Sequence, residues 1–278
     1  MSVIVMGYRN AATIVSAVSS VIDQLEPRVE VVVVTSGPES GAAAVRAAFP
    51  DVHVVESLDR LQPGGARNLG VRSSTGDVVA FLAADCIAAP GWLRGRLRAH
   101  GAGYRAVASA VSCAAPRTPW AVAAWLIGYA NRLPGYPAGA VDRRSARRHS
   151  LSIDRALLEL CGGYDESVQI GEDTIVADRV LGRGETIQFE PAVCIAHHGP
   201  RGPWGLIADE FARGRRLRTH QRSSGTIEPR WSLWRRAIVK IRHSLESGWR
   251  YGGIGPAFVV GASPFVVVGV VAQLLGAR

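Results

Sequence analysis

Charged side chains follow an apolar segment of this 278-residue sequence at a place where α/β proteins bind ligands. Asp85 comes directly after the apolar run 78–83 and two alanines. If that run is a buried strand, the carboxylate lies at its carboxyl end, where it could hold a divalent cation together with substrate phosphates. Asp85 could equally cap a helix beginning near residue 90 or lie in a solvated turn.

A glycine-rich segment opens a second candidate binding element. Gly64 and Gly65 come just before Arg67 at the start of a predicted helix over 65–74. Backbone amides at a helix start and a guanidinium can receive a phosphate or a base edge. The sequence contains no Walker P-loop, and these glycines do not match the dinucleotide-binding fingerprint.

Acidic and imidazole side chains gather further along the chain. Glu172 and Asp173 open a predicted helix over 172–182, where the helix dipole favours carboxylates. One of them could be a general base for a hydroxyl nucleophile, and the simpler alternative is that both only cap the helix. His197 and His198 end the last predicted strand, where an imidazole could bind a metal or a phosphate, although histidines with neither role are commoner.

The elements that must position these residues alternate in type. The pattern predicts strands near 2–6, 29–35, 52–55 and 78–83, and helices near 11–25, 41–48, 65–74 and 90–100. This order predicts an α/β fold with a mostly parallel sheet, and ligands in such sheets bind at the carboxyl ends of the strands.

The segment 105–200 is less regular and should complete the sheet and build an acceptor side. It predicts strands at 106–113, 149–153 and 192–197, helices at 119–130, 154–161 and 172–182, and a Gly/Pro loop at 134–140. The four cysteines have neither zinc-ligand nor redox-pair spacing, so a reducing compartment is expected.

The last eighty residues differ in character from the rest. Helical stretches at 204–220 and 230–250 flank a break at 223–229, and residues 201–250 carry 12 Lys and Arg against 4 acidic residues. The run 254–275 has only two polar side chains, which favours a membrane span over a buried core helix, with a hairpin bent at Pro264 as a further alternative.

Tryptophans interleaved with arginines before this run indicate a membrane interface; they are Trp204, Trp231, Trp234 and Trp249. No recognised nucleic-acid motif accompanies the basic residues, including the arginines at 143–144 and 147–148, so nucleic acid is not expected as a partner. The positive-inside tendency places the domain before the span in the cytoplasm.

Taken in order, several segments resemble a family 2 glycosyltransferase of the GT-A fold. Residues 2–10 resemble its opening strand and nucleotide loop, and residues 65–70 and 76–85 its Ala-Arg-Asn-x-Gly block and metal motif. Residues 162–166, with Glu172, Asp173 and Arg179, resemble its acceptor-side block. The resemblance covers roughly residues 2–200 and implies a Rossmann-like GT-A domain with a mostly parallel sheet and flanking helices.

The resemblance also implies an inverting transfer from a nucleotide-diphosphate sugar. Asp173 would be the catalytic base, and a divalent Mn or Mg ion on Asp85, with support from His197, would stabilise the leaving diphosphate. The donor would contact Gly7, Tyr8, Arg67, Asn68, Asp85 and Glu172.

Two positions depart from the family pattern. Ala83 stands where the metal motif usually has its first aspartate, and the turn at 35–38 has no acid to read the base. The nucleotide is therefore open, and donor affinity could be weak.

The chain is accordingly expected to contain a GT-A domain over 1–200, a basic amphipathic helical segment over 201–250 and a transmembrane or membrane-inserted segment over 251–278. The expected function is sugar transfer to a lipid-linked or polysaccharide acceptor of the cell envelope, at the cytoplasmic face of the cell membrane. The alternative is a catalytically weakened nucleotide-binding or scaffold protein at the membrane.

Overall fold

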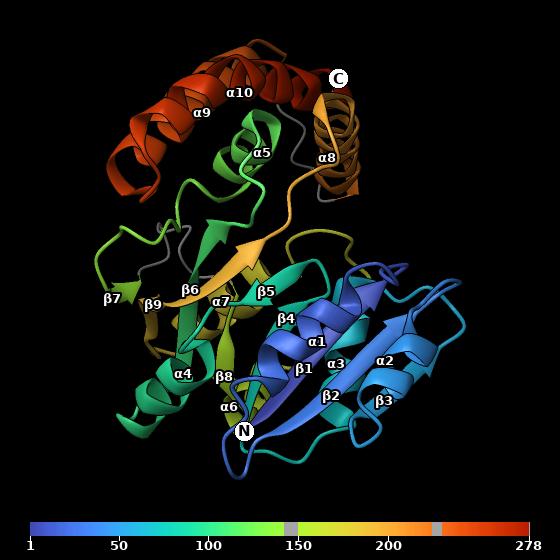
Figure 1. The fold of residues 1–278 in the computed structure, drawn as a ribbon. Helices are drawn as coiled ribbons and strands as arrows, with labels where there is room; N and C mark the ends of the chain where they lie inside the picture. The colour runs from blue at the N-terminus through green and yellow to red at the C-terminus, as the bar shows by residue number, and fades with distance from the viewer. Residues whose placement is uncertain (142–149, 224–229, 278) are drawn as a thin grey trace. The chain divides into compact units, whose positions relative to one another are not determined.

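The computed structural model describes residues 1–141, 150–223 and 230–277 (Figure 1). The chain forms two compact units. The sheet unit comprises Met1–Ala110 and Pro137–Ala196, and the helical unit comprises Val111–Tyr136 and His197–Arg278. The chain therefore leaves the sheet unit after Ala110, returns at Pro137 and leaves it finally after Ala196, a division that differs from a single boundary at residue 200.

A parallel four-stranded half forms the first part of the sheet, as the sequence predicts. The order is β3-β2-β1-β4, with Val3 opposite both Val31 and Ala80. The strands are β1 (Ser2–Tyr8), β2 (Glu30–Ser36), β3 (His53–Ser57) and β4 (Val78–Ala83). The middles of β1, β2 and β4 are buried, because helices cover both faces of the sheet.

Four helices follow these strands, close to their predicted positions. They are α1 (Ile14–Ile22), α2 (Ala42–Ala48), α3 (Pro63–Arg72) and α4 (Trp92–Gly101). In Figure 1, α1 and α2 lie on one face of the parallel strands and α3 on the other, as right-handed crossovers require. A Cβ at Gly70 would lie 2.3 Å from Ile4 Cγ2, so α3 packs directly on β1.

The remaining strands make the sheet mixed. It continues β4-β8-β6-β9-β5, β7 pairs with β9, and β8 is antiparallel to both β4 and β6. These elements are β5 (Cys86–Ala88), β6 (Ala106–Cys113), β7 (Gly139–Val141), β8 (Ser152–Asp154), β9 (Ile187–His197), α6 (Arg155–Leu160) and α7 (Glu172–Gly182).

Three features of this half differ from the prediction. β5 and β7 are only three residues long and were not expected, and β7 falls partly in the predicted Gly/Pro loop. β9 begins five residues earlier than predicted, because Pro191 inside it obscures the strand pattern. The predicted strand at 149–153 corresponds to β8, although residue 149 lies outside the described residues.

The described part of the helical unit contains four helices. They are α5 (Pro119–Tyr129), α8 (Pro203–Ser223), α9 (Arg230–Tyr251) and α10 (Pro256–Gly276). α10 contacts all three others through a buried stripe that includes Val259, Ala262, Val266 and Val270. Most of the predicted break at 223–229, from 224 onward, lies outside the described residues.

α10 is continuous through Pro264 and does not form a hairpin there. Proline offers no backbone N–H, so the carbonyl of Val260 loses its usual helical donor. The hydroxyl of Ser263 donates to that carbonyl at 2.8 Å. Among the described residues, α10 alone has the length and composition to cross a membrane, and 39% of its most apolar window is buried.

Candidate functional site

A cavity of about 300 Å³ opens in the sheet unit at the carboxyl ends of β1, β2 and β4. Five of the predicted site residues line it together, from four separate parts of the chain: Gly7, Tyr8, Arg67, Asp85 and Glu172. Its other lining residues are Met6, Asn10, Ser36, Leu61, Pro63, Ala66, Ala83 and Ala84. The parallel topology therefore brings these side chains together where ligands bind in such sheets.

The end of β1 supplies a flat aromatic surface. The guanidinium of Arg60 lies 4.7 Å from the centre of the Tyr8 ring, and a Cβ at Gly37 would approach that ring to 2.7 Å. Gly37 has φ +73°, a conformation that glycine adopts without strain. Both residues lie close to the Tyr8 ring, and the backbone N–H of Tyr8 donates to Asn10 Oδ1 at 3.0 Å.

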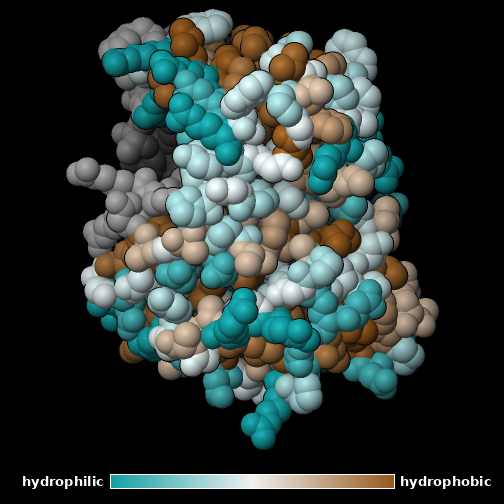
Figure 2. All heavy atoms as spheres, turned by 60° about the vertical axis from the view of Figure 1, so that its left-hand side comes forward, coloured by the Kyte–Doolittle hydropathy of each residue, from teal (hydrophilic) through white to brown (hydrophobic). Residues whose placement is uncertain are grey.

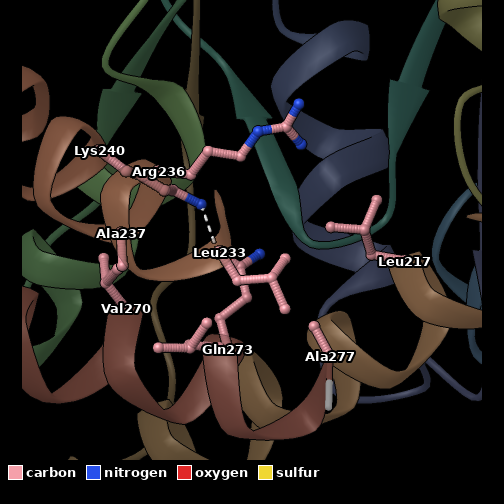
Figure 3. A pocket seen from close by; sticks show the side chains of 9 residues that line it. Leu217, Leu233, Arg236, Ala237, Lys240, Val270, Gln273 and Ala277 are labelled. Atoms are coloured by element: carbon pink, nitrogen blue, oxygen red, sulfur yellow. Dashed lines mark hydrogen bonds between the residues drawn. The ribbon is translucent and has the colours of Figure 1, made fainter. Parts of the chain in front are cut away.

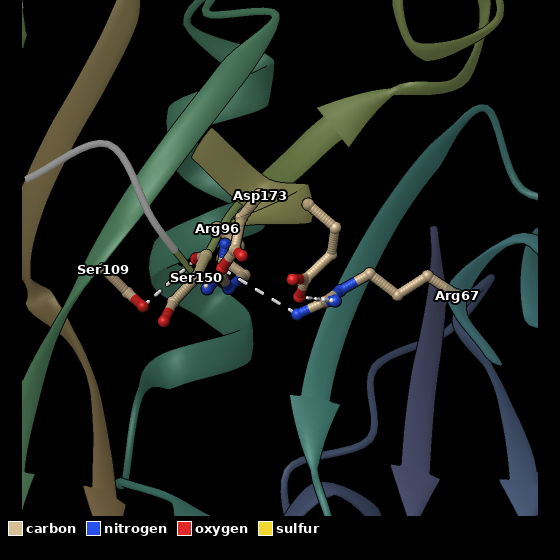
Figure 4. Close-up of polar contacts among 6 residues, drawn as sticks. Arg67, Arg96, Ser109, Ser150 and Asp173 are labelled. Carbon is tan, nitrogen blue, oxygen red and sulfur yellow. Dashed lines mark hydrogen bonds and ion pairs between the residues drawn. The ribbon is translucent and has the colours of Figure 1, made fainter. Parts of the chain in front are cut away.

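Arg67 lies at the centre of the charged part of the site (Figure 4). Its Nη1 donates to Glu172 Oε1 at 2.5 Å, and its Nη2 lies 3.8 Å from Asp173 Oδ2. The guanidinium also stacks on the ring of Tyr164 at 5.0 Å. Burial alone would lower the pKa of Arg67, but Asp173, Tyr164 and Glu172 together raise it above its ordinary value, so this cation stays charged.

The two carboxylates at the start of α7 differ in environment. Burial and the neighbouring Asp173 raise the pKa of Glu172, while Arg67 acts against that shift. The side chain of Asp173 is 26% exposed. Gly171, with φ +91°, occupies the N-cap without a side-chain hydrogen bond. The carboxylates therefore do not act as N-cap residues of α7, and both face Arg67.

Asp85 occupies the two-residue turn between β4 and β5 and lines the cavity half-buried. It is not the cap of α4, because that helix begins at Trp92 with Gly91 at its N-cap. Carboxylates of Asp85 and Glu172 face one cavity, and hard oxygen ligands of this kind suit Mg²⁺ or Mn²⁺. Ala83 is exposed on the same lining.

Asn68 makes contacts other than those the sequence suggests. Its amide donates to the carbonyl of Tyr164 at 2.9 Å and to Glu166 at 2.8 Å, and its oxygen accepts the N–H of Tyr164 at 3.0 Å. At the same junction, a Cβ at Gly64 would lie 2.2 Å from the carbonyl oxygen of Asp165. Asn68 thus joins α3 to the segment before α7 and is absent from the described lining of the cavity, so its donor contact stays a prediction.

His197 is the last residue of β9 and belongs to the helical unit. Its ring centre lies 5.0 Å from that of Tyr129 in the same unit. Its predicted support for a metal or diphosphate stays a prediction.

A buried arginine was not singled out from the sequence. Arg96 on α4 is fully buried, donates to Ser152 Oγ at 2.7 Å and donates to the carbonyl of Ser150 at 2.9 Å. Ser150 has φ +55°, and burial lowers the pKa of Arg96 to about 9. Figure 4 draws this cluster together with Arg67 and Asp173. In the sequence Arg96 is one of several arginines on a helix, so no pattern distinguished it.

The family comparison matches most of the sheet unit. The sequence pattern of Glycosyl transferase family 2 matches residues 2–139. The succinoglycan biosynthesis protein ExoO of Rhizobium meliloti is 29% identical over an alignment of 217 residues, and the match covers 70% of this chain and 59% of that protein. The glycosyltransferase AglE of Haloferax volcanii is 25% identical over 228 residues, 77% of this chain and 72% of that protein. This chain thus spans well under two thirds of ExoO.

Solved structures share the fold. The mannosyltransferase PcManGT from Pyrobaculum calidifontis, in complex with GDP-Man and Mn²⁺, has a TM-score of 0.59 at 20% identity, covering 99% of this chain and 86% of that one. TarS residues 1–349 of S. aureus, in complex with UDP-GlcNAc, have a TM-score of 0.58 at 14% identity, covering 100% and 89%.

Proposed function

The chain belongs to glycosyltransferase family 2, and from this premise we propose that it transfers a sugar from a nucleotide-diphosphate donor to an acceptor hydroxyl at the membrane, with inversion. The observation that carries the proposal is the cavity that gathers Tyr8, Arg67, Asp85 and Glu172, with Asp173 held against Arg67. A flat aromatic surface, a buried cation and carboxylates are the groups that a nucleoside diphosphate and a hydroxyl nucleophile need.

The donor would lie along the cavity with its base at the Tyr8 end. Tyr8 offers a ring face, Asn10 and Ser36 offer neutral polar groups, and the lining has no acid at the end of β2. Arg67 would face the phosphates, since a guanidinium binds phosphate oxygens through paired donors. The solved relatives in fold bind GDP-Man and UDP-GlcNAc, so the class of donor is supported and its base and sugar are left to experiment.

Asp173 would act as the general base. Its carboxylate would take the proton of the acceptor hydroxyl while that oxygen forms a bond to the anomeric carbon and the bond from that carbon to the diphosphate breaks. Arg67 fixes the position of Asp173 through the contact at 3.8 Å and fixes that of Glu172 through a shorter ion pair. Because Asp173 is partly exposed, an acceptor could reach it.

Asp85 would hold a divalent cation, with Glu172 as the other carboxylate on the same lining. Such an ion, when bound, neutralises charge on the leaving diphosphate. The Mn²⁺ in the PcManGT structure supports this assignment by fold alone.

The helical unit would attach the enzyme to the membrane that carries a lipid-linked or polysaccharide acceptor. Three large apolar side chains on α9 are 47 to 67% exposed and share one face, since Trp234, Ile238 and Trp249 are separated by about one and three turns. Arg235, Arg242 and Arg250 are exposed beside them. Figure 2 shows hydrophobic (brown) and hydrophilic (teal) residues intermixed over the upper part of that view.

Tryptophan interleaved with arginine suits the interface of an anionic membrane. The basic stretch would keep the sheet unit on the cytoplasmic side. The name of ExoO, a succinoglycan biosynthesis protein, supports a polysaccharide acceptor.

The decisive experiment separates donor binding from transfer. Calorimetric titration with UDP, GDP and dTDP, with Mn²⁺ or Mg²⁺ and again with chelator, identifies which nucleotide base the cavity binds. Transfer of radiolabelled sugar to cell-envelope extract then measures turnover. Asp173→Asn should retain nucleotide binding and lose transfer by at least about 100-fold. Asp178→Asn, exposed on the same helix, is the matched control and should behave as wild type.

Asp85→Ala should lose the metal-dependent part of nucleotide binding. Unchanged turnover in Asp173→Asn would overturn the base assignment. Absence of nucleotide binding in folded wild-type protein would favour the alternative of a membrane scaffold. Flotation with anionic vesicles tests attachment: Trp234→Ser/Trp249→Ser should bind less, whereas Leu58→Ser, an exposed leucine of the sheet unit, should not change binding.

A further inference from the structure

A second cavity lies within the helical unit, lined by α8, α9 and α10 (Figure 3). Its volume is about 180 Å³. Most of its lining is apolar, and two cations, Arg236 and Lys240, also line it. The other lining residues are Leu217, Leu233, Ala237, Val270, Gln273, Leu274 and Ala277. No acidic side chain is among the described lining residues.

Glycines of α8 and α10 lie next to residues that line this cavity. A Cβ at Gly214 of α8 would lie 2.0 Å from the carbonyl oxygen of Gln273, and a Cβ at Gly276 of α10 would lie 2.1 Å from the carbonyl oxygen of Phe211. The two backbones are therefore in direct contact beside the cavity. A cavity held in this way exists before a ligand arrives, so binding need not order the helices first.

Lys240 places a charge in an environment that solvates it poorly. Its ammonium group donates a hydrogen bond to Gln273 Oε1 at 2.6 Å (Figure 3). This neutral acceptor satisfies one of the three N–H donors of the ammonium group. Burial lowers the pKa of Lys240 to about 8, although Glu210 on α8 acts to raise it and Arg213 to lower it. Glu210 is itself buried, lies 3.7 Å from Arg213 and has a raised pKa because of burial.

We propose that this cavity binds the phosphate headgroup and the first part of the chain of an anionic lipid. The phosphate would be met by Lys240 and Arg236, and the chain by the leucine and valine side chains that form the rest of the lining. A half-buried ammonium gains more from an anion than an exposed one, because the local dielectric is lower. A neutral polar head could form hydrogen bonds with this lining but no ion pair, so an anionic head should bind more tightly.

This inference does not rest on sugar transfer, because every residue in it belongs to the helical unit and its readout is binding. It also differs from attachment through the exposed face of α9, since Lys240 and Arg236 would bind a single lipid molecule in a cavity and not the membrane surface. Failure of one proposal therefore leaves the other standing.

The test is calorimetric titration of the full chain with dodecyl phosphate below its micelle concentration. Dodecanol has the same chain without the anion, and inorganic phosphate has the anion without the chain. Dodecyl phosphate should bind with one-to-one stoichiometry and at least about tenfold more tightly than either, since one charge-assisted contact contributes at least 1.4 kcal/mol.

Lys240→Met should lose at least tenfold in affinity for dodecyl phosphate and still fold, because an apolar side chain of similar length replaces a half-buried charge. Arg236→Met, at an exposed position, gives a second variant with little risk to folding and should also weaken binding. Arg242→Met is the matched control, since Arg242 is exposed on the same helix, pairs with Glu246 and is outside the lining.

Loss of affinity in the first two variants and not in the control supports the proposal. Equal binding of dodecanol and dodecyl phosphate would overturn it, as would tight binding of inorganic phosphate alone. Unchanged affinity in both Lys240→Met and Arg236→Met, or no binding to the folded wild type, would also overturn it.

Discussion

Replacing Arg67 by methionine tests the buried charge cluster most directly. The substitution leaves Glu172, 8% exposed, without its ion-pair partner. The contact with Asp173 at 3.8 Å alone corresponds to about 4 kcal/mol at an effective dielectric of about 20, before the cost of desolvation. Removing one member of a buried pair typically costs about 3–5 kcal/mol, so we expect Arg67→Met to lower the free energy of unfolding by about 3 kcal/mol at pH 7.

The loss in the free energy of unfolding caused by Arg67→Met should depend on pH with a defined sign. Without Arg67, the already raised pKa of Glu172 rises further, because the lowering influence is gone. Between the unfolded value of 4.5 and this raised folded value, the folded state binds a proton that the unfolded state lacks. The variant therefore gains stability as pH falls, by up to about 1.4 kcal/mol per pH unit, and its deficit against wild type should narrow at pH 5.

Urea unfolding at pH 5 and pH 7 measures both effects, provided that the m-values of the variants agree. Arg67→Met/Glu172→Met removes both charges and should recover about 1–2 kcal/mol relative to Arg67→Met alone. Arg72→Met, whose exposed side chain on the same helix contacts Glu166 at 3.6 Å, should cost less than about 0.5 kcal/mol. Additive losses in the double variant, or a deficit equal at both pH values, would refute the reasoning.

Three further changes test other parts of the sheet unit. Gly64→Ala should lower the free energy of unfolding by about 1–3 kcal/mol, because its Cβ would meet the carbonyl of Asp165. Gly101→Ala, with open space around it, is the control and should leave the free energy of unfolding unchanged. Thermal unfolding of both variants measures the difference. Glu30 accepts hydrogen bonds from Ser2, Thr75 and Gly76, which outweigh burial and lower its pKa to about 2. The stability that these bonds contribute is present above pH 4.5 and is lost as pH falls toward 2. The difference in the free energy of unfolding between wild type and Glu30→Gln should therefore shrink from pH 7 to pH 3 in urea unfolding. Ala83→Asp adds a carboxylate at an exposed lining position beside Asp85 and should tighten Mn²⁺ binding by about tenfold in calorimetry. Binding that is unchanged or weaker would contradict the placement of the cation beside Ala83.

Much of the sheet unit could be predicted from local pattern. Apolar runs such as 31–34 and 78–83 identify strands buried on both faces, and their order determines which carboxyl ends meet. This is why Tyr8 and Asp85 could be assigned to one edge of the sheet before any coordinates, whereas the family resemblance assigned Arg67 and Glu172 to the same site. The family resemblance added the chemistry that the pattern alone left open.

The rest depends on contacts between residues far apart in sequence. The stacking of Arg60 on Tyr8, the burial of Arg96 and the clamp made by Asn68 leave no periodic signal. The sequence pattern of α5 is that of an ordinary apolar helix. No nearby residue indicates that it packs against α10, more than a hundred residues later in the chain. Three-residue strands such as β5 are too short for a pattern to distinguish them from a turn.

The path of the chain through α5 limits how the protein can be divided. Trp125 and Leu126 are buried within the helical unit, and Gly248 and Gly252 approach them so closely that Cβ atoms there would meet their side chains at 3.4 Å or less. A truncation near residue 200 would strip α5 of these neighbours and expose a tryptophan and several aliphatic side chains to water. The helical unit therefore cannot be removed without exposing the core around α5. A chain shortened near residue 200 would misfold, and this misfolding could be mistaken for the release of a membrane anchor.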